Sequence, residues 1–361
     1  MNEVLKTIYF LVQQMWFFAI PLLIVALGGM FSERSGVVNI ALEGIMIVGA
    51  FCSIFFINFM QGLPPQIALW TEQLAERLAT GQVGQGTANF LQTLYNILLT
   101  FTKGQPLLIL AIFVAVISGM VFSLLHAYAG INLRSDQTIS GTALNMIAPA
   151  FAIYMARTLQ TNNVQQVQFT NTFRITSVPV LGDIPVLGPL LFQNTYITTY
   201  LGIVILLVAA FVLYKTKFGL RLRSCGEHPQ AADSVGINVY RIRYAGVMIS
   251  GALAGLGGLV FVIPTSTNFN ATVAGYGFLA LAVLIFGQWK PLRIFMAALF
   301  FGLMKTIASA YSGVPFLKGL PIPSDIYKMV PYITTLIVLA FTSRNSQAPK
   351  ASGVPYDRGG R

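Results

Sequence analysis

KTKFGLRLRSCGEHPQAADSVGINVYRIR, residues 215–243, is the longest polar and basic segment of the chain with a strongly apolar stretch on each side. Six of its residues are Lys or Arg, and two acids, Glu227 and Asp233, lie near its middle. Pro229 can begin a short helix, because its missing N–H would be unpaired in a first turn anyway. Gly236 can end that helix, because glycine adopts the left-handed terminal conformation without a Cβ clash. The pattern predicts a short capped helix between two membrane spans, which is typical of a docking element.

The composition is that of a membrane protein. The chain has 361 residues, of which 55% are hydrophobic and 9% are charged, and its mean hydropathy is +0.72. A soluble domain carries roughly a quarter charged residues, so a lipid bilayer must solvate much of this surface. The net charge of +11 could suggest nucleic acid, but the basic residues lie in loops between apolar segments rather than on one soluble face. We therefore expect a bilayer and no nucleic acid as partner.

Nine apolar segments are candidates for membrane spans, and the first is too long for a signal peptide. The fold class predicted is all-α, a polytopic transmembrane helix bundle of about 9–10 spans, some broken or re-entrant. The seventh and ninth candidates are short for a full crossing. The candidates are residues 8–31, 37–59, 106–128, 138–158, 196–214, 244–264, 274–288, 291–310 and 327–342.

Positive charge orients these segments. If residues 215–243 are cytoplasmic, alternation places 14 of the 22 Lys and Arg residues on the cytoplasmic side. Cytoplasmic loops are enriched in Lys and Arg, so this orientation is favoured. It places the N-terminus outside and the C-terminus inside.

The connecting segments complete one domain. We expect residues 1–342 to form a single transmembrane domain, with extracytoplasmic loops at 60–105 and 159–195. The first loop contains LWTEQLAERLA, residues 69–79, which predicts an amphipathic helix lying on the membrane surface. The second reads as a strand-like cap; either loop could receive a partner or serve as a simple lid. The polar tail, residues 343–361, predicts disorder.

Motifs for catalysis are missing from the sequence. It contains no GxxxxGK[ST], HExxH or GxSxG string and no Cys/His cluster with metal-ligand spacing. We therefore predict no enzyme activity, no cofactor and no metal, with any ATP hydrolysis in a separate subunit. Cys52 and Cys225 are interpreted as small packing residues, and neither His126 nor His228 is predicted to be catalytic.

Asn39 and Glu43 carry the first candidate chemistry. They are four residues apart and so share one helical face at the membrane boundary. A carboxylate in a span must be paired or lie near water. Either this face lines a translocation path, or Glu43 forms a structural pair with Asn39 or Arg34.

Two further stretches carry inward groups. Asp136 can cap the helix that begins near residue 138, which makes Thr142 and Asn145 inward polar groups at i and i+3. They could line the path, but interhelical hydrogen bonds are favoured. The glycines of SGALAGLGGLVF, residues 250–261, predict close helix packing at the centre of the bundle.

The last stretch precedes a short apolar helix. Gly275 and Gly277 begin it, and Asn268 stands just before. A half-helix directed into the bundle would place free N–H groups and a positive dipole end at mid-membrane. It either lines the pathway or is a short tilted span.

Together these stretches resemble the permease subunits of bacterial ABC importers of the branched-chain amino acid, ribose and nucleoside type. The resemblance rests on ALGGMFSERSGVVNIALEGIMIVGAF (26–51), SDQTISGTALN (135–145), the basic loop and GYGFLALAVLIFGQWKP (275–291), in that order. It is strongest to the nucleoside or simple-sugar branch. The insert at 60–105 departs from the family pattern.

The resemblance implies an assembly in the bacterial inner membrane. Its partners would be a cytoplasmic ABC ATPase, a second permease subunit, homologous or identical, and an extracytoplasmic substrate-binding protein or lipoprotein. The basic loop would contain the coupling helix that contacts the ATPase, although family members often have Asn where this chain has His228. The residues assigned to coupling are Glu227, His228, Pro229, Ala231, Asp233 and Gly236.

The predicted function is import of a small polar solute, with nucleosides favoured over riboflavin or a simple sugar. The residues assigned to the substrate pathway are Asn39, Glu43, Thr142, Asn145, Asn268, Gly275 and Gly277. Two other classes remain open at this stage. An ion-coupled secondary transporter would need titratable groups at mid-membrane, and an intramembrane enzyme would need paired catalytic groups.

Overall fold

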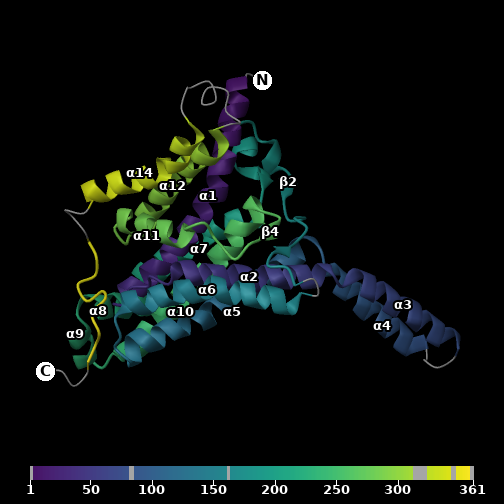
Figure 1. The fold of residues 1–361 in the computed structure, drawn as a ribbon, viewed down its shortest axis with the longest axis horizontal. Coiled ribbons are helices and arrows are strands. Elements are labelled where there is room, and N and C mark those ends of the chain that lie inside the picture. Colours follow the sequence, from purple (N-terminus) through teal and green to yellow (C-terminus); the bar gives the residue numbers. More distant parts are fainter. Residues whose placement is uncertain (1–2, 81–84, 161–162, 312–322, 343–346, 358–361) are drawn as a thin grey trace.

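The computed structural model describes residues 3–80, 85–160, 163–311, 323–342 and 347–357. Figure 1 shows a bundle of long helices, as the sequence predicts. The helices are α1 (Glu3–Arg34), α2 (Leu42–Gln61), α3 (Pro64–Ala79), α4 (Gln85–Thr100), α5 (Gly104–Ala127), η1 (Tyr128–Asn132), α6 (Gln137–Leu159), η2 (Leu181–Asp183), η3 (Gly188–Phe192), α7 (Ile197–Lys215), α8 (Lys217–Glu227), α9 (Pro229–Ser234), α10 (Val239–Thr265), α11 (Tyr276–Phe286), α12 (Pro291–Ala310) and α14 (Ser324–Thr342).

The apolar helices confirm the predicted polytopic membrane fold. In the part of the chain that the structure describes, seven helices are long and apolar enough to cross a bilayer, and α11 is a shorter apolar helix. The seven overlap the first to sixth and the eighth predicted spans. The seventh and ninth predicted segments correspond to α11 and α14.

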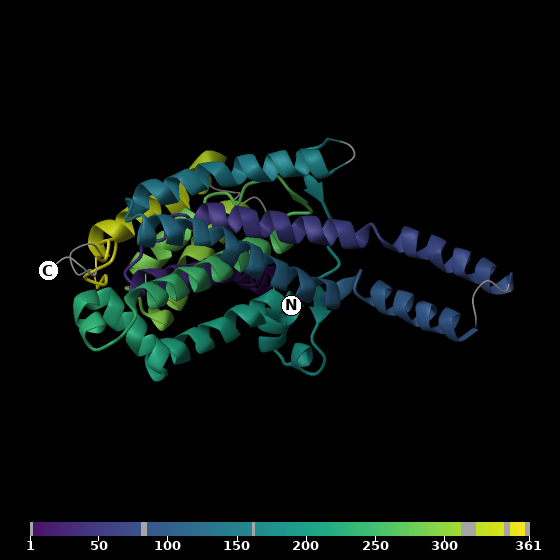
Figure 2. The same ribbon diagram turned by 90° about the horizontal axis from the view of Figure 1, so that it is seen from below.

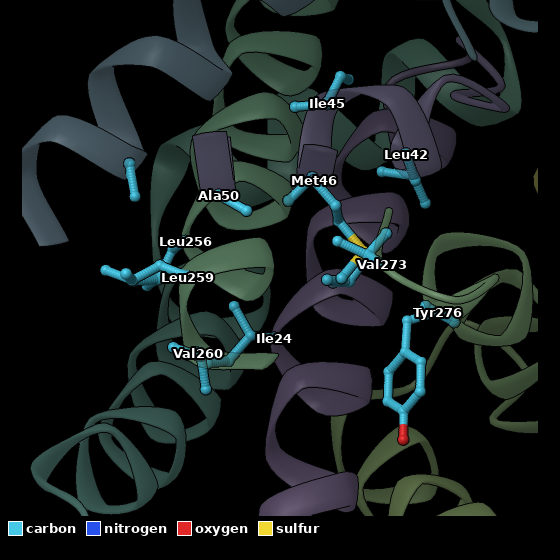
Figure 3. Close-up of a cluster of buried hydrophobic side chains, with 14 of the residues drawn as sticks. Ile24, Leu42, Ile45, Met46, Ala50, Leu256, Leu259, Val260, Val273 and Tyr276 are labelled. Carbon is cyan, nitrogen blue, oxygen red and sulfur yellow. The ribbon is translucent and has the colours of Figure 1, made fainter. Parts of the chain in front are cut away.

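Helix α10 lies at the centre and packs against α1, α2 and α5. Its glycines permit this: a Cβ on Gly49 of α2 would lie 2.3 Å from Cα of Gly255, and one on Gly119 of α5 would lie 2.4 Å from the carbonyl oxygen of Gly251. The small-residue face predicted in α10 is therefore a packing face. Around it, α1, α2 and α10 bury aliphatic side chains such as Ile24 against one another (Figure 3).

The insert at 60–105 is a helical hairpin. Figure 2 shows α3 and α4 lying side by side and projecting beyond the bundle along the direction of α2. The ring of Trp70 in α3 lies 6.1 Å from that of Tyr95 in α4. The amphipathic helix predicted at 69–79 is part of α3, one arm of this hairpin.

Residues 163–195 form the predicted strand-like cap. β1 (Val167–Gln168) pairs antiparallel with β4 (Asn268–Phe269), with Val167 opposite Phe269. β2 (Ile175–Ser177) pairs antiparallel with β3 (Gln193–Thr195). This cap lies at the end of the bundle opposite α9.

The C-terminal segment corrects a prediction. Of the tail expected to be disordered, residues 347–357 pack against the loops at the α9 end of the bundle (Figure 1). The N–H of Ala351 donates to the carbonyl oxygen of Gly226 at 2.8 Å, and the N–H of Gly353 donates to that of Gly36 at 3.2 Å. Tyr356 is buried, so a polar composition did not prevent this segment from ordering.

Candidate functional site

The basic loop contains two helices instead of one. The hydroxyl of Thr216 accepts a hydrogen bond from the N–H of Gly219 at 3.1 Å and so begins α8. Pro229 occupies the first turn of α9, and Gly236 has a φ of +83°, the left-handed conformation that closes the loop. The short capped helix is thus confirmed, whereas the sequence reasoning missed α8.

One face of α9 is held by the protein. Ala232 is buried in a small apolar cluster with Cys225, Val239 and Tyr356. Burial raises the pKa of the Cys225 thiol, although the nearby Arg243 opposes this. We call residues 227–236 the α9 loop. This loop therefore packs on Tyr356 of the C-terminal segment as well as on Cys225 and Val239.

The other face of the α9 loop is open. Val235 is 74% exposed. The predicted coupling residues divide between the two faces: Pro229 is buried and Asp233 is half-buried, while the exposed ones are Glu227, His228, Ala231 and Gly236. Val235 and the four exposed residues therefore form the solvent-facing side of the loop.

Arg243 anchors the C-terminal segment beside this loop. Its side chain is 1% exposed, Nη1 donates to the carbonyl oxygen of Val354 at 3.0 Å, and the guanidinium lies 5.8 Å from the ring of Tyr356. At the surface, Arg134 forms a bidentate pair with Asp357 at 2.8 and 2.9 Å. The hydrogen bonds to Asp357 raise the pKa of the Arg134 guanidinium.

Four polar contacts connect the α9 loop to α11. Arg34, the last residue of α1, lies 3.6 Å from a carboxylate oxygen of Glu227 and donates to the carbonyl oxygen of Trp289 at 3.2 Å. The indole of Trp289 donates to Glu33 at 2.6 Å, and its backbone N–H reaches Leu284 in α11. The end of α1 and the end of α11 are therefore fixed to the loop.

The segment before α2 turns back into the bundle. Gly36 lies beside Arg243, whereas Asn39 donates to the hydroxyl of Ser250 at 2.9 Å. Asn39 and Glu43 are both buried in the bundle, 0% and 8% exposed.

Glu43 caps the N-terminus of α11. Its two carboxylate oxygens accept the N–H groups of Gly275 at 2.9 Å and Gly277 at 2.6 Å. A Cβ on Gly277 would lie 2.4 Å from Cα of Glu43, so only glycine permits this approach. A structural pair was expected as one alternative, but neither Asn39 nor Arg34 is the partner.

α11 is the predicted half-helix. Its 11 residues span about 16 Å, roughly half of a bilayer's hydrocarbon core. Gly275 precedes it with a φ of +76°. The free N–H groups expected at its start are occupied by the Glu43 carboxylate, which compensates the positive end of the helix dipole.

The other predicted pathway residues fall into different places. Asn145 accepts the N–H of Gly44 at 2.7 Å and donates to the carbonyl oxygen of Ile40 at 2.9 Å, so it fixes the start of α2. Thr142 is exposed and donates to the carbonyl oxygen of Thr138, so the inward position expected for it is wrong. Asn268 lies at the cap end of the bundle.

Asn268 lines a polar pocket of about 520 Å³. The other walls come from the end of α2 and from β1 and its neighbours, including Asn58, Gln61 and Thr170. The side chain of Gln61 binds the backbone of Thr170 at 2.8 and 2.9 Å, which fixes the pocket wall. The pocket opens at the end of the bundle opposite α9.

Sequence reasoning missed a polar group inside the bundle. The Tyr276 side chain is 1% exposed, its ring lies 4.1 Å from that of Phe261, and no described group bonds its hydroxyl. In Figure 3 this hydroxyl is directed away from the aliphatic cluster. The Lys305 ammonium of α12 lies 5.7 Å from the Tyr276 ring. A lysine within an apolar span was the available signal.

His126 makes two buried contacts. The His126 ring is buried between the carbonyl oxygen of Val38 and the hydroxyl of Ser140, both at 2.9 Å. It holds the segment before α2. Over the described ranges, no three His, Cys, Asp or Glu side chains are grouped to hold a metal ion.

Comparison with known proteins gives consistent matches. The profile of the family described as "Branched-chain amino acid transport system / permease component" matches residues 11–339. The chain is similar to the guanosine ABC transporter permease protein NupQ of Bacillus subtilis, with 41% identity and 95% of each chain covered. It is 38% identical to the nucleoside ABC transporter permease protein NupC of Lactococcus lactis, over 98% of each chain.

More distant matches extend to another solute. The putative glucose ABC transporter permease protein TsgC13 of Haloferax volcanii is 28% identical, over 90% of this chain and 88% of its own length. No solved structure gives a significant match.

Proposed function

Because this chain belongs to the family of branched-chain amino acid transport system permeases, we propose that it is the permease subunit of an ABC importer that carries nucleosides. The substrate assignment rests on the similarity of this chain, over nearly its full length, to permeases named for guanosine and for nucleosides. The relative named for glucose is more distant, which makes a simple sugar the second candidate.

Groups inside the bundle would form a surface suited to a nucleoside once α11 moves, because Tyr276 is fully buried in this structure. Tyr276 and Phe261 present aromatic rings, and the Tyr276 hydroxyl and Lys305 ammonium supply polar groups inside the membrane. Aromatic rings stack on planar bases, and buried unpaired donors favour a ligand with hydroxyl groups. In this proposal the substrate passes this surface from the Asn268 pocket.

Other predicted pathway residues have supporting roles in the proposal. Glu43, Gly275 and Gly277 fix the half-helix that carries Tyr276. Asn39 and Asn145 hold the segment before α2: the Nδ2 group of Asn39 donates to Ser250, and the amide of Asn145 binds backbone groups. They shape the pathway without contacting the solute.

The α9 loop is the proposed contact for the ATPase. Its exposed face, around Val235, would dock on a separate nucleotide-binding subunit. Movement of the loop would reach α11 through Glu227, Arg34 and Trp289, because these residues are joined by short polar contacts. α11 carries Tyr276, so a shift there changes the substrate surface.

The remaining assignments follow from this role. We propose that the chain resides in a bacterial inner membrane, with the α9 loop and the C-terminus in the cytoplasm and the N-terminus outside. A second permease, homologous or identical, and an extracytoplasmic binding protein or lipoprotein would complete the importer. The catalytic step, ATP hydrolysis, would belong to the ATPase.

Uptake by the assembled importer tests the substrate. The complex is reconstituted in proteoliposomes with ATP, and entry of radiolabelled guanosine is measured. We expect uptake that unlabelled nucleosides inhibit and that glucose or riboflavin does not. Inhibition by glucose or riboflavin alone would contradict the substrate, and uptake driven by an ion gradient with no ATPase would contradict the class.

Tyr276→Phe tests the interior surface. The substitution removes only the buried unpaired hydroxyl, so the thermal stability should not fall, while the guanosine concentration at half-maximal uptake should rise several-fold. An unchanged half-saturation concentration would place the substrate route elsewhere.

Substitutions in the α9 loop test the coupling. Gly236→Pro forces φ to about −65° at a position that needs +83°, and Asp233→Lys reverses the charge of a half-buried side chain in α9. Both should abolish substrate-stimulated ATP hydrolysis while the protein still inserts. Asp183→Lys, the same charge change at the opposite end, is the control. Retained stimulation in both loop variants would refute the docking role.

A further inference from the structure

A second pocket, of about 480 Å³, lies at the α9 end of the bundle. Its walls come from the ends of α1 and α7, from α8, from the residue before α12 and from the C-terminal segment. We call it the basic pocket, because its lining includes four cationic side chains, Arg34, Arg223, Lys290 and Lys350, but one carboxylate, Glu227.

The positive charge of the basic pocket is largely uncompensated. Glu227 lies 3.6 Å from Arg34 and is the only acid among the described residues that line the pocket. The Nε of Arg34 is buried with no partner among the described groups. Arg223 contacts the carbonyl oxygen of Gly219 at 3.4 Å and lies 5.5 Å from the ring of Tyr214, so neither contact supplies negative charge.

Helix geometry adds to this potential. Lys290 is the residue before the first turn of α12, a helix of 20 residues whose N-terminus has no side-chain cap. The first N–H groups of a helix are unpaired and its N-terminal dipole is positive, which favours an anion. The cationic side chains and the helix dipole therefore both favour binding of an anion in the basic pocket.

The pocket lies at the level of the span ends. Arg34 ends α1, Tyr214 is in the last turn of α7, and Lys290 precedes α12. Three membrane helices thus reach the bilayer boundary around this pocket. Phospholipid phosphates lie at the same level, where Tyr, Lys and Arg are the favoured side chains.

We propose that the basic pocket binds a phosphate group, which in the membrane is the headgroup phosphate of an anionic phospholipid. Guanidinium groups bind phosphate oxygens in a bidentate manner, and two arginines face this pocket. Its volume is in the range of small-ligand sites. Because Glu227 and Arg34 form one wall, the bound headgroup lies directly against the α9 loop.

Lipid binding by the full-length chain in a neutral detergent tests this inference independently of transport. Short-chain phosphatidylglycerol is titrated against the wild type and against Arg223→Gln/Lys290→Gln/Lys350→Gln. The control is Lys217→Gln/Arg221→Gln/Arg241→Gln, which removes three exposed charges at the same end. Each cation lost near the surface should weaken binding roughly fivefold, so about a hundredfold is expected for the pocket variant. Less than a threefold change is expected for the control.

Two comparisons complete the test. The Lys350→Gln variant changes only one exposed side chain, so it should fold normally. It should still bind phosphatidylglycerol about fivefold more weakly than the wild type does. Short-chain phosphatidylcholine and inorganic phosphate are the reference ligands. Equal affinity for the two lipids, or equal loss in the pocket and control variants, would overturn the proposal. Binding of inorganic phosphate as tight as that of phosphatidylglycerol would overturn the assignment to a lipid.

Discussion

Glu43→Gln is the substitution that tests how α11 is held. Glu43 is 8% exposed, and its two oxygens accept the N–H groups of Gly275 and Gly277 at 2.9 and 2.6 Å. Glutamine has the same shape, but only one of its terminal atoms is an acceptor. One of the two N–H groups must then face an NH₂ group and lose its hydrogen bond.

The magnitude follows from opposing effects. A hydrogen bond to a charged group contributes about 1.5–3 kcal/mol, and the interaction of the carboxylate with the helix dipole up to about 2 kcal/mol. Removing the charge also relieves the desolvation penalty of a buried ion, which offsets part of this loss. We expect Glu43→Gln to lower the free energy of unfolding by about 2 kcal/mol.

The measurement is a denaturant titration of the full-length chain in mixed micelles, followed by circular dichroism. Hydrogen exchange at the N–H of Gly277 reports the same contact locally and should become faster. Glu72→Gln on the projecting helix α3 is the matched control, since that glutamate is exposed and its change should stay within about 0.5 kcal/mol.

Two results would refute the reasoning. If Glu43→Gln were as stable as the wild type or more stable, the desolvation penalty would outweigh the capping bonds, and the carboxylate would not hold α11. If exchange at Gly277 were unchanged while stability fell, the loss would arise elsewhere in the bundle.

Three further predictions concern other contacts. Gly277→Ala places a Cβ 2.4 Å from the backbone of α2 and should lower the unfolding temperature and the yield of folded protein, whereas Gly86→Ala, with nothing within 4 Å, should do neither; equal effects would contradict the close approach. The Cys225 thiol is buried and burial raises its pKa, so less thiolate is present at a given pH and maleimide labelling should be slow. Tyr356→Ala opens the cluster and should accelerate that labelling; an unchanged rate would show that the C-terminal segment does not cover the thiol. Val235 is 74% exposed, so the cysteine of the Val235→Cys variant should react with a membrane-impermeant maleimide only after cells are permeabilised. Labelling in intact cells would contradict the proposed orientation.

The sequence predicted the features that depend on local patterns. Long apolar runs identify membrane spans whatever they pack against, because a bilayer solvates every face of a helix. Pro229 and Gly236 begin and end the α9 loop because their own backbone preferences fix φ. The small residues of α10 predicted its central position for the same local reason.

Contacts between distant segments could not be predicted in this way. Gly275 and Gly277 are 232 and 234 residues from Glu43, and nothing in the local sequence names them as its partners. The C-terminal segment has a polar composition typical of disorder. It is nevertheless ordered, because the buried Arg243, which is distant in sequence, donates a hydrogen bond to the carbonyl oxygen of Val354.

The direction in which a membrane helix faces also required the tertiary structure. Thr142 was expected to point inward and is exposed, whereas Lys305, which lies within the predicted span 291–310, is beside the buried Tyr276. In a soluble helix the apolar face indicates the core, but both faces of a membrane helix are apolar. The sequence by itself therefore determined which segments cross the membrane, and only the packing of those segments decided which polar groups meet inside it.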